Sequence, residues 1–186
     1  MAWGAIVRGW GLDAQGQAEE GIAQIRQGLA AYRATGAELF RPYMLALLAE
    51  AYGHVGQAEE GLRALTEALA VVHTTGERWW EAELHRLQGE LLLQSGVQSQ
   101  ASSVFTPHSA EAEACFQRAL VVARRQQAKS FELRAALSLS RLWQRQGKRD
   151  AAHQLLAEVY GWFTEGFDTA DVQEAKALLE EMRWSR

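Results

Sequence analysis

The chain repeats itself at a fixed interval, and this repetition limits its possible folds more than any other feature. Residues 16–21 (GQAEEG) return unchanged as residues 56–61, a shift of 40 positions. Residues 68–71 (ALAV) then match residues 119–122 (ALVV) after a further 51 positions. A period of this length is typical of proteins in which similar supersecondary units stack one on the next and share a continuous core.

The repeating units are predicted to be pairs of helices. The sequence is rich in Ala, Leu, Glu, Gln and Arg, which favour helices, and contains only two prolines. No stretch alternates apolar with polar residues over the length of a strand. We expect first helices near 2–14, 40–54, 78–95 and 130–146, and second helices near 17–34, 57–74, 110–126 and 149–163.

Small residues recur at the same place in each first helix. The loop glycines that we expect to end these helices are Gly16, Gly56, Gly96 and Gly147, and the small residues seven positions earlier are Gly9, Ala49, Gly89 and Ser140. A helix that crosses its neighbour closely can carry only a small side chain at the crossing point. The pattern therefore predicts close packing within every pair.

These observations predict one all-α domain of about four antiparallel helix pairs. The repeats are expected at about 2–36, 37–76, 77–127 and 128–166, with an exposed loop insertion at 96–109 that contains Pro107. A capping helix at 168–183 begins after Asp168. Its apolar residues Val172, Ala175, Leu178, Leu179 and Met182 have helical spacing, whereas Glu174, Lys176, Glu180 and Glu181 are expected to face away.

Composition argues against several classes of function. The formal net charge is −4, which gives no basic field for nucleic acid or for an anionic membrane. Apolar residues never run to the ~18 that suggest a membrane span. The one cysteine, Cys115, cannot form an internal disulfide, and no signal peptide is evident. We therefore expect a cytoplasmic protein.

The sequence predicts neither catalysis nor a cofactor. Gly147 and Lys148 are not followed by the Ser or Thr of a phosphate-binding loop. The histidines lack the spacing of a zinc site on a helix, so no metal is expected. Glu81 and His85 lie one helical turn apart, where we interpret them as a solvated ion pair, and Cys115 is interpreted as a buried packing residue.

The repeats resemble tetratricopeptide repeats (TPRs), whose second helices carry Ala-x-x-x-Phe, as Ala112 to Phe116 do here. This resemblance implies a right-handed superhelix. Residues 16–21, 76–87 (GERWWEAELHRL) and 160–171 (YGWFTEGFDTAD) further resemble the carboxy-terminal repeats of large bacterial signalling ATPases. That resemblance implies a regulatory, protein-binding segment without catalytic residues of its own.

A concave wall lined by first helices is the predicted binding surface for a protein or peptide. Its residues are Tyr43, Glu50, Glu83, Arg86, Glu90, Arg134, Leu137, Arg141 and Arg145. The order is apolar, then acidic, then basic, which suits a peptide whose carboxylates meet the arginines. A merely solvated face is the alternative.

Two further functions are compatible with the sequence. Trp3, Ile6 and Trp10 recur at helical spacing on the first helix and predict a self-association patch, in which the partner is a second copy. The other alternative is a sensor that holds a small ligand or peptide in the groove.

Overall fold

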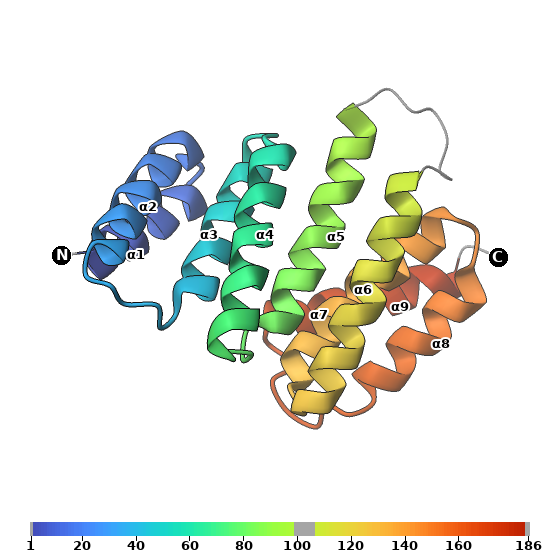
Figure 1. Ribbon diagram of the computed structural model, residues 1–186. Helices are drawn as coiled ribbons and strands as arrows, with labels where there is room; N and C mark the ends of the chain where they lie inside the picture. Colours follow the sequence, from blue (N-terminus) through green and yellow to red (C-terminus); the bar gives the residue numbers. More distant parts are fainter. Residues whose placement is uncertain (1, 99–106, 185–186) are drawn as a thin grey trace.

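The computed structural model describes residues 2–98 and 107–184, and within these ranges the chain folds into helices joined by turns (Figure 1). The helices, in chain order, are α1 (Ala2–Ala14), α2 (Ala18–Arg33), α3 (Arg41–His54), α4 (Ala58–Thr75), α5 (Glu81–Gln98), α6 (Pro107–Gln126), α7 (Lys129–Arg145), α8 (Arg149–Tyr160) and α9 (Ala170–Trp184). The predicted all-α class is confirmed.

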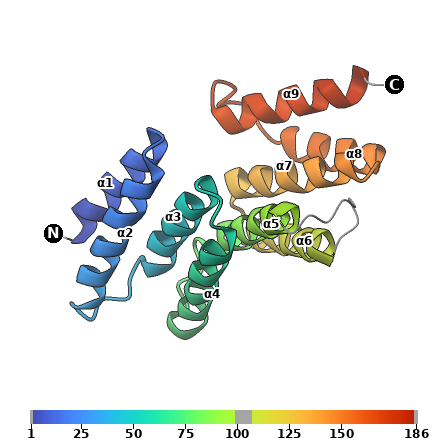
Figure 2. The same cartoon turned by 90° about the horizontal axis from the view of Figure 1, so that it is seen from above.

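The helices pack as successive hairpins. The first helices α1, α3, α5 and α7 each contact the second helix that follows them, and each also contacts the next first helix along the chain. The hairpins curve into an arc, and α9 packs against α7 and α8 at the far end (Figure 2). This arrangement is an α-solenoid, in which each unit is covered by its neighbours.

Glycines end three of the first helices as expected. Gly16, Gly56 and Gly147 follow α1, α3 and α7 with φ of 80°, 74° and 77°, a left-handed conformation that glycine adopts without steric cost. The prediction for Gly96 is wrong, because this residue lies inside α5.

The expected insertion at 96–109 is accordingly shorter at both ends. Helix α5 continues to Gln98, and α6 already begins at Pro107, the helix position that tolerates proline best. Part of the extra length of this repeat therefore lies in its two helices, which are the longest pair in the described chain. Residues 99–106 lie outside the described residues.

The small residues at the helix crossings lie where the repeat predicts them. A Cβ atom on Gly9 would stand 2.6 Å from the carbonyl oxygen of Gly21 and 2.7 Å from Cγ1 of Ile25, so α1 and α2 touch through their backbones. In α7 the equivalent residue is Ser140, which is fully buried and donates a hydrogen bond of 3.1 Å to the carbonyl of Ala152. At the crossing of α7 and α8, a hydrogen bond from the Ser140 hydroxyl thus takes the place of the direct backbone contact seen between α1 and α2.

Two large clusters of buried apolar residues form the core. One extends from Ile6 to Leu91 and joins the first two hairpins to α5, whereas the other extends from Ala112 to Met182. Leu92 and Leu93 of α5 pack against the second cluster, so this helix belongs to both. Figure 1 shows α5 between the two halves.

The apolar face of α9 is buried in the second cluster as expected, through Val172, Ala175, Leu178, Leu179 and Met182. Its charged residues Glu174, Lys176, Glu180 and Glu181 lie outside this buried face, and two of them contact α7. Glu174 forms an ion pair with Arg141, and Glu181 accepts a hydrogen bond of 2.8 Å from Gln144. Both contacts are made because α9 packs beside α7 as a further first helix.

Candidate functional site

The structure places the predicted groove residues on consecutive first helices, but their charges largely pair with one another. The carboxylate of Glu83 is buried and accepts hydrogen bonds of 3.0 and 2.8 Å from Nε and Nη2 of Arg86. Nη1 of Arg134, on the next first helix, lies 2.9 Å from the same carboxylate. Two arginines therefore share one buried acid.

Arg86 is held in its charged form by these neighbours. Burial opposes the charge, but the hydrogen bonds that Arg86 donates to Glu83 and the negative charges of Glu83, Glu90 and Glu50 raise the pKa of Arg86. Glu90 lies 3.5 Å from Nη1 of Arg86 and accepts a hydrogen bond of 2.6 Å from the hydroxyl of Ser138 on α7. The positive charge of Arg86 therefore offsets part of the negative charge on the acidic part of this face.

The basic part of the face is likewise paired, so the expected change of sign along the groove is wrong. Nε of Arg134 lies 3.7 Å from a carboxylate oxygen of Asp171, and Arg141 forms the ion pair with Glu174. Both acids belong to α9, whose position beside α7 was not apparent from the spacing of charges. Arg145 is exposed and helps to line a depression between α7 and α9.

Two of the predicted contact residues belong to the core. Leu137 is 3% exposed and packs in the second apolar cluster, so it cannot touch a partner. Ile6 is 1% exposed, and its inclusion in an exposed patch is wrong. It is turned about 60° around the helix from Trp3, which directs it toward Gly28 of α2. Trp3 and Trp10 are each nearly half exposed, as expected.

A row of aromatic rings crosses the hairpins at the amino-terminal ends of the first helices. We call this set the aromatic row; its members are Trp3, Phe40, Tyr43, Trp79, Trp80 and Phe131. The ring centroids of Trp3 and Phe40 lie 5.9 Å apart, and those of Phe40 and Trp79 lie 5.8 Å apart, both edge to face. Trp80 then contacts Tyr43 at 4.9 Å and Phe131 at 5.0 Å. Such contacts stabilise aromatic pairs beyond their buried area.

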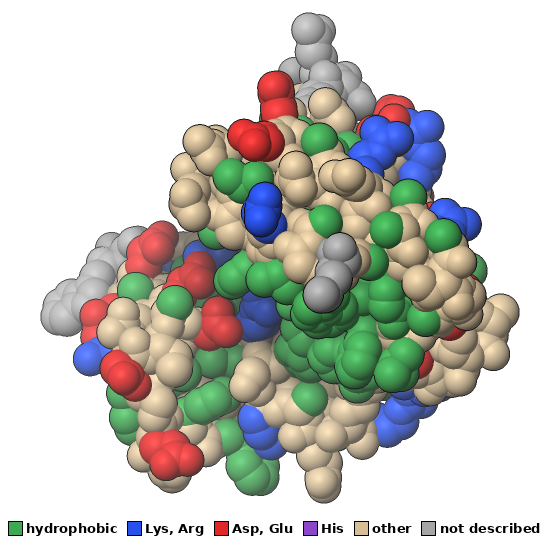
Figure 3. Space-filling view, turned by 90° about the vertical axis from the view of Figure 1, so that its left-hand side faces the viewer, with side chains coloured by type: hydrophobic (Ala, Val, Ile, Leu, Met, Phe, Trp, Pro, Cys, Tyr) green, Lys and Arg blue, Asp and Glu red, His purple; other side chains and the backbone are tan. Residues whose placement is uncertain are grey.

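The aromatic row was not predicted as a site. The available signal was the repetition itself, because Leu39 and Phe40 recur as Trp79 and Trp80, and Trp80 recurs as Phe131. Phe40 and Trp79 expose more than a third of their surface, and Leu39 is still more exposed. Viewed from the amino-terminal end, hydrophobic side chains form a continuous patch, with acidic and basic side chains next to it (Figure 3).

Glu77 holds two members of the aromatic row in place. The backbone of Phe40 is left-handed, with φ of 62°, and its N–H donates to both carboxylate oxygens of Glu77 at 2.9 and 3.0 Å. The indole Nε1 of Trp79 donates to the same carboxylate at 2.7 Å. One acid in the loop between α4 and α5 therefore fixes aromatic residues of two adjacent repeats.

Glu81, His85 and Cys115 lie in buried or half-buried surroundings. Glu81 and His85 are both buried, so the interpretation as a solvated ion pair is wrong. Glu81 pairs with Arg78 at 3.1 Å and with Arg125 at 3.6 Å. Cys115 is half-buried, and burial raises the pKa of its thiol, which disfavours the reactive thiolate. Among the described residues, no group of His, Cys, Asp or Glu side chains could hold a metal ion.

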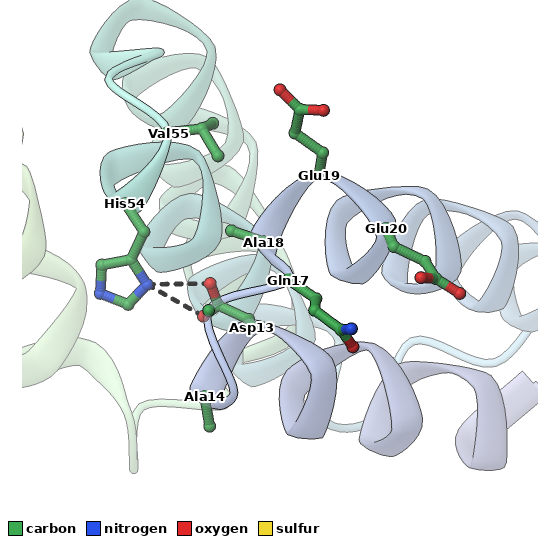
Figure 4. A pocket seen from close by; sticks show the side chains of 9 residues that line it. Asp13, Ala14, Gln17, Ala18, Glu19, Glu20, His54 and Val55 are labelled. Carbon is green, nitrogen blue, oxygen red and sulfur yellow. Dashed lines mark hydrogen bonds and ion pairs between the residues drawn. The ribbon is translucent and has the colours of Figure 1, made fainter.

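A separate open depression lies where the first two hairpins meet. Nδ1 of His54 lies 2.9 Å from the buried carboxylate of Asp13, and Gln17, Glu19 and Glu20 line the rest (Figure 4). Glu19 and Glu20 point away from the His54–Asp13 pair. The pair therefore acts as a bridge between hairpins.

No helix across 2–98 and 107–184 is long and apolar enough to cross a membrane.

Similarity to solved structures identifies the architecture. Two crystal structures, one of a variant, contain the nearly identical TPR-like repeats of a Podosopora anserina protein assigned as a kinesin light chain. They match with TM-scores of 0.68 and 0.64 at 18% and 20% identity, over 97% of this chain and 92% of theirs. The chain has a TPR-like fold.

The TPR-like domain is also similar to the apo form of RapI. That match has a TM-score of 0.66 at 10% identity and covers 98% of this chain and 48% of RapI. No protein-family profile matches the sequence, and neither does any curated protein.

Proposed function

We propose that this TPR-like domain is a non-catalytic module that binds another polypeptide. The observation that carries the proposal is the aromatic row, whose rings lie in contact at the amino-terminal ends of four first helices and are partly exposed. Contiguous exposed apolar surface marks interaction sites, and aromatic residues dominate the binding energy at such sites.

The chemistry of the groove favours a partner with apolar anchors. Since Arg86 and Arg134 share Glu83, and Arg141 pairs with Glu174, most of the charge on this face is satisfied internally. An acidic peptide would have to displace these partners before it could bind the arginines. We therefore place the main contacts on Phe40 and Trp79, with Arg145 available to a carboxylate at the far end.

A displayed library of random peptides tests this proposal. Selection against the domain should enrich peptides with aromatic or large aliphatic residues, and Trp79→Ala should weaken their binding at least tenfold by calorimetry. The matched control is Trp162→Ala, which removes an indole that is more exposed than that of Trp79, at 65% against 42%, but lies outside the aromatic row. Peptides that bind all three proteins equally would place the site elsewhere.

A charge-based version of the same function predicts a different result. If the arginines bound an acidic peptide, the double reversal of Arg141 and Arg145 to Glu would abolish binding, whereas Trp79→Ala would leave it intact. Binding that depends on the reversal alone would overturn the role proposed for the aromatic row. The double reversal should leave the fold intact, because exposed charges contribute little to stability.

We further propose that the domain is the carboxy-terminal repeat region of a bacterial signalling ATPase. The support is the resemblance of residues 16–21, 76–87 and 160–171 to such repeats. Sequencing the gene upstream of the codon for Met1 tests this: a nucleotide-binding domain in the same reading frame is expected, and a stop codon in that frame would contradict it.

A further inference from the structure

Trp143 and Trp79 each donate the indole N–H to a glutamate. Nε1 of Trp143 lies 2.8 Å from a carboxylate oxygen of Glu113. Nε1 of Trp79 lies 2.7 Å from a carboxylate oxygen of Glu77. The pair of Trp143 and Glu113 is completed by Lys148, whose Nζ lies 3.2 Å from the carboxylate and 6.0 Å from the centroid of the indole ring. One ammonium group there interacts with the acid and the ring together.

The pair of Trp79 and Glu77 has no such cation in the part of the chain that the structure describes. Within 2–98 and 107–184, no lysine or arginine forms an ion pair with Glu77 or lies over a ring of the aromatic row. Arg78, which stands between the two residues in the sequence, pairs with Glu81 at 3.1 Å instead. The described chain therefore leaves this pair without the ammonium group that its counterpart has.

The position for a cation is accessible and already ordered. Trp79 is 42% exposed, and Phe40 beside it is 40% exposed. The carboxylate of Glu77 is fixed by the N–H of Phe40 as well as by the indole of Trp79. A partner would therefore find the acid in place and would lose little side-chain entropy of the domain on binding.

A cationic side chain gains from two interactions at this position. A cation within about 6 Å of an indole face is attracted by the ring, as Lys129 is at 4.1 Å from the centroid of Trp162. A carboxylate offers about four lone-pair sites, so Glu77 can accept a further hydrogen bond. A purely apolar partner would instead cover the charge of Glu77 without compensating it, which is costly.

The groove beside the aromatic row carries a second acid without an ion pair. Glu50 lies on α3 about two turns beyond Tyr43, and no ion pair to it is formed within the described ranges. The charge of Glu50 raises the pKa of Arg86, but Arg86 donates its hydrogen bonds to Glu83. The uncompensated charge next to the aromatic row is therefore negative.

We propose that Trp79 and Glu77 bind a lysine or arginine side chain of the partner polypeptide, in the arrangement that Lys148 adopts with Trp143 and Glu113. This inference rests on the proposed function, because it takes the aromatic row as the surface on which the partner docks. The partner segment then combines an apolar anchor with a neighbouring basic residue.

Peptides selected on the domain test this inference. The enriched sequences should carry lysine or arginine next to their apolar residues. In one such peptide, lysine is replaced by norleucine, or arginine by citrulline, which removes the charge and keeps the aliphatic chain. By calorimetry, this replacement should weaken binding to the wild-type domain about fivefold, and binding to Glu77→Gln by less than about twofold.

The comparison of the two peptides separates binding by Glu77 from a purely structural role. If Glu77 only positioned Phe40 and Trp79, Glu77→Gln would weaken the charged and the neutral peptide equally, and the proposal would be wrong. Glu19→Gln removes an exposed acid outside the aromatic row and should keep the fivefold preference of the wild type. Circular dichroism checks that both variants remain helical.

The selection itself distinguishes this inference from the proposed function. Enriched peptides that lack lysine and arginine, and that still depend on Trp79, would contradict the cation while leaving the aromatic row as the binding site. A library that yields no binding peptide would overturn the proposed function, and this inference with it.

Discussion

At the scale of single residues, identical glycines in one helix have opposite effects on stability. Gly9→Ala should destabilise the domain by about 1 to 3 kcal/mol, because the new methyl group would overlap the backbone of Gly21 and the side chain of Ile25. Gly11→Ala should stabilise it by up to about 1 kcal/mol, because that position is open and alanine favours the helix. Urea denaturation of both variants, at concentrations where the wild type is monomeric, measures the difference. Equal effects would mean that α1 and α2 do not touch at Gly9.

The buried histidine His85 should make stability depend on pH. Burial and the charge of Arg118 lower its pKa, against the opposing effect of a hydrogen bond with Gln88. Below about pH 6.5 the unfolded chain therefore binds a proton that the folded chain still excludes. The free energy of unfolding should fall as the pH is lowered from 6.5 through the reduced pKa of His85.

His85→Gln should flatten that dependence, as followed by denaturation at a series of pH values. A slope unchanged by His85→Gln would assign the effect to another group.

At the scale of helices and their ends, one repeat uses an unfavourable residue. The turns after α2 and α4 place Gly36 and Gly76 at φ of 75°, whereas Gln127 takes up the corresponding left-handed turn after α6 at φ of 56°. This conformation costs a residue with a side chain about 1 kcal/mol. Gln127→Gly should stabilise the domain by somewhat less than this cost, because glycine loses more backbone conformational freedom on folding than glutamine does.

The neighbouring glutamine is the control for that prediction. Gln126→Gly should destabilise the domain, because it weakens the last turn of α6 and removes a hydrogen bond to the carbonyl of Arg78. Thermal unfolding followed by circular dichroism compares the two variants. A loss of stability in Gln127→Gly would show that its side chain makes a contact worth more than the strain.

The positions of the helices could be predicted because the repeat and helical spacing are both local signals. The pairing of charges could not, since Arg134 and Arg141 find their partners on α9, more than thirty residues away. Ile6 was misplaced for a related reason. Its spacing from Trp3 fits one stripe, but α1 has two apolar faces, and only the packing against Gly28 shows to which one Ile6 belongs.

At the scale of the whole molecule, two apolar clusters that meet at α5 should give two regions of stability. Leu65 and Leu156 are both fully buried, one in each cluster. Substitution of either by Ala should cost about 2 to 5 kcal/mol. Since contacts in a solenoid reach only to neighbouring units, hydrogen exchange should increase mainly within the half that carries the substitution. Equal increases in both halves would show that the domain unfolds as a single unit.

The aromatic row has a consequence for how bending of the solenoid can be observed. Its rings belong to different repeats and touch edge to face, so a change in the angle between α1, α3, α5 and α7 must slide ring over ring. Indole emission responds to neighbouring charge and to solvent, and the nitrogen of Trp79 is bound to the carboxylate of Glu77. The intrinsic tryptophan fluorescence of the domain should therefore change when the solenoid bends, so bending can be followed without an attached label.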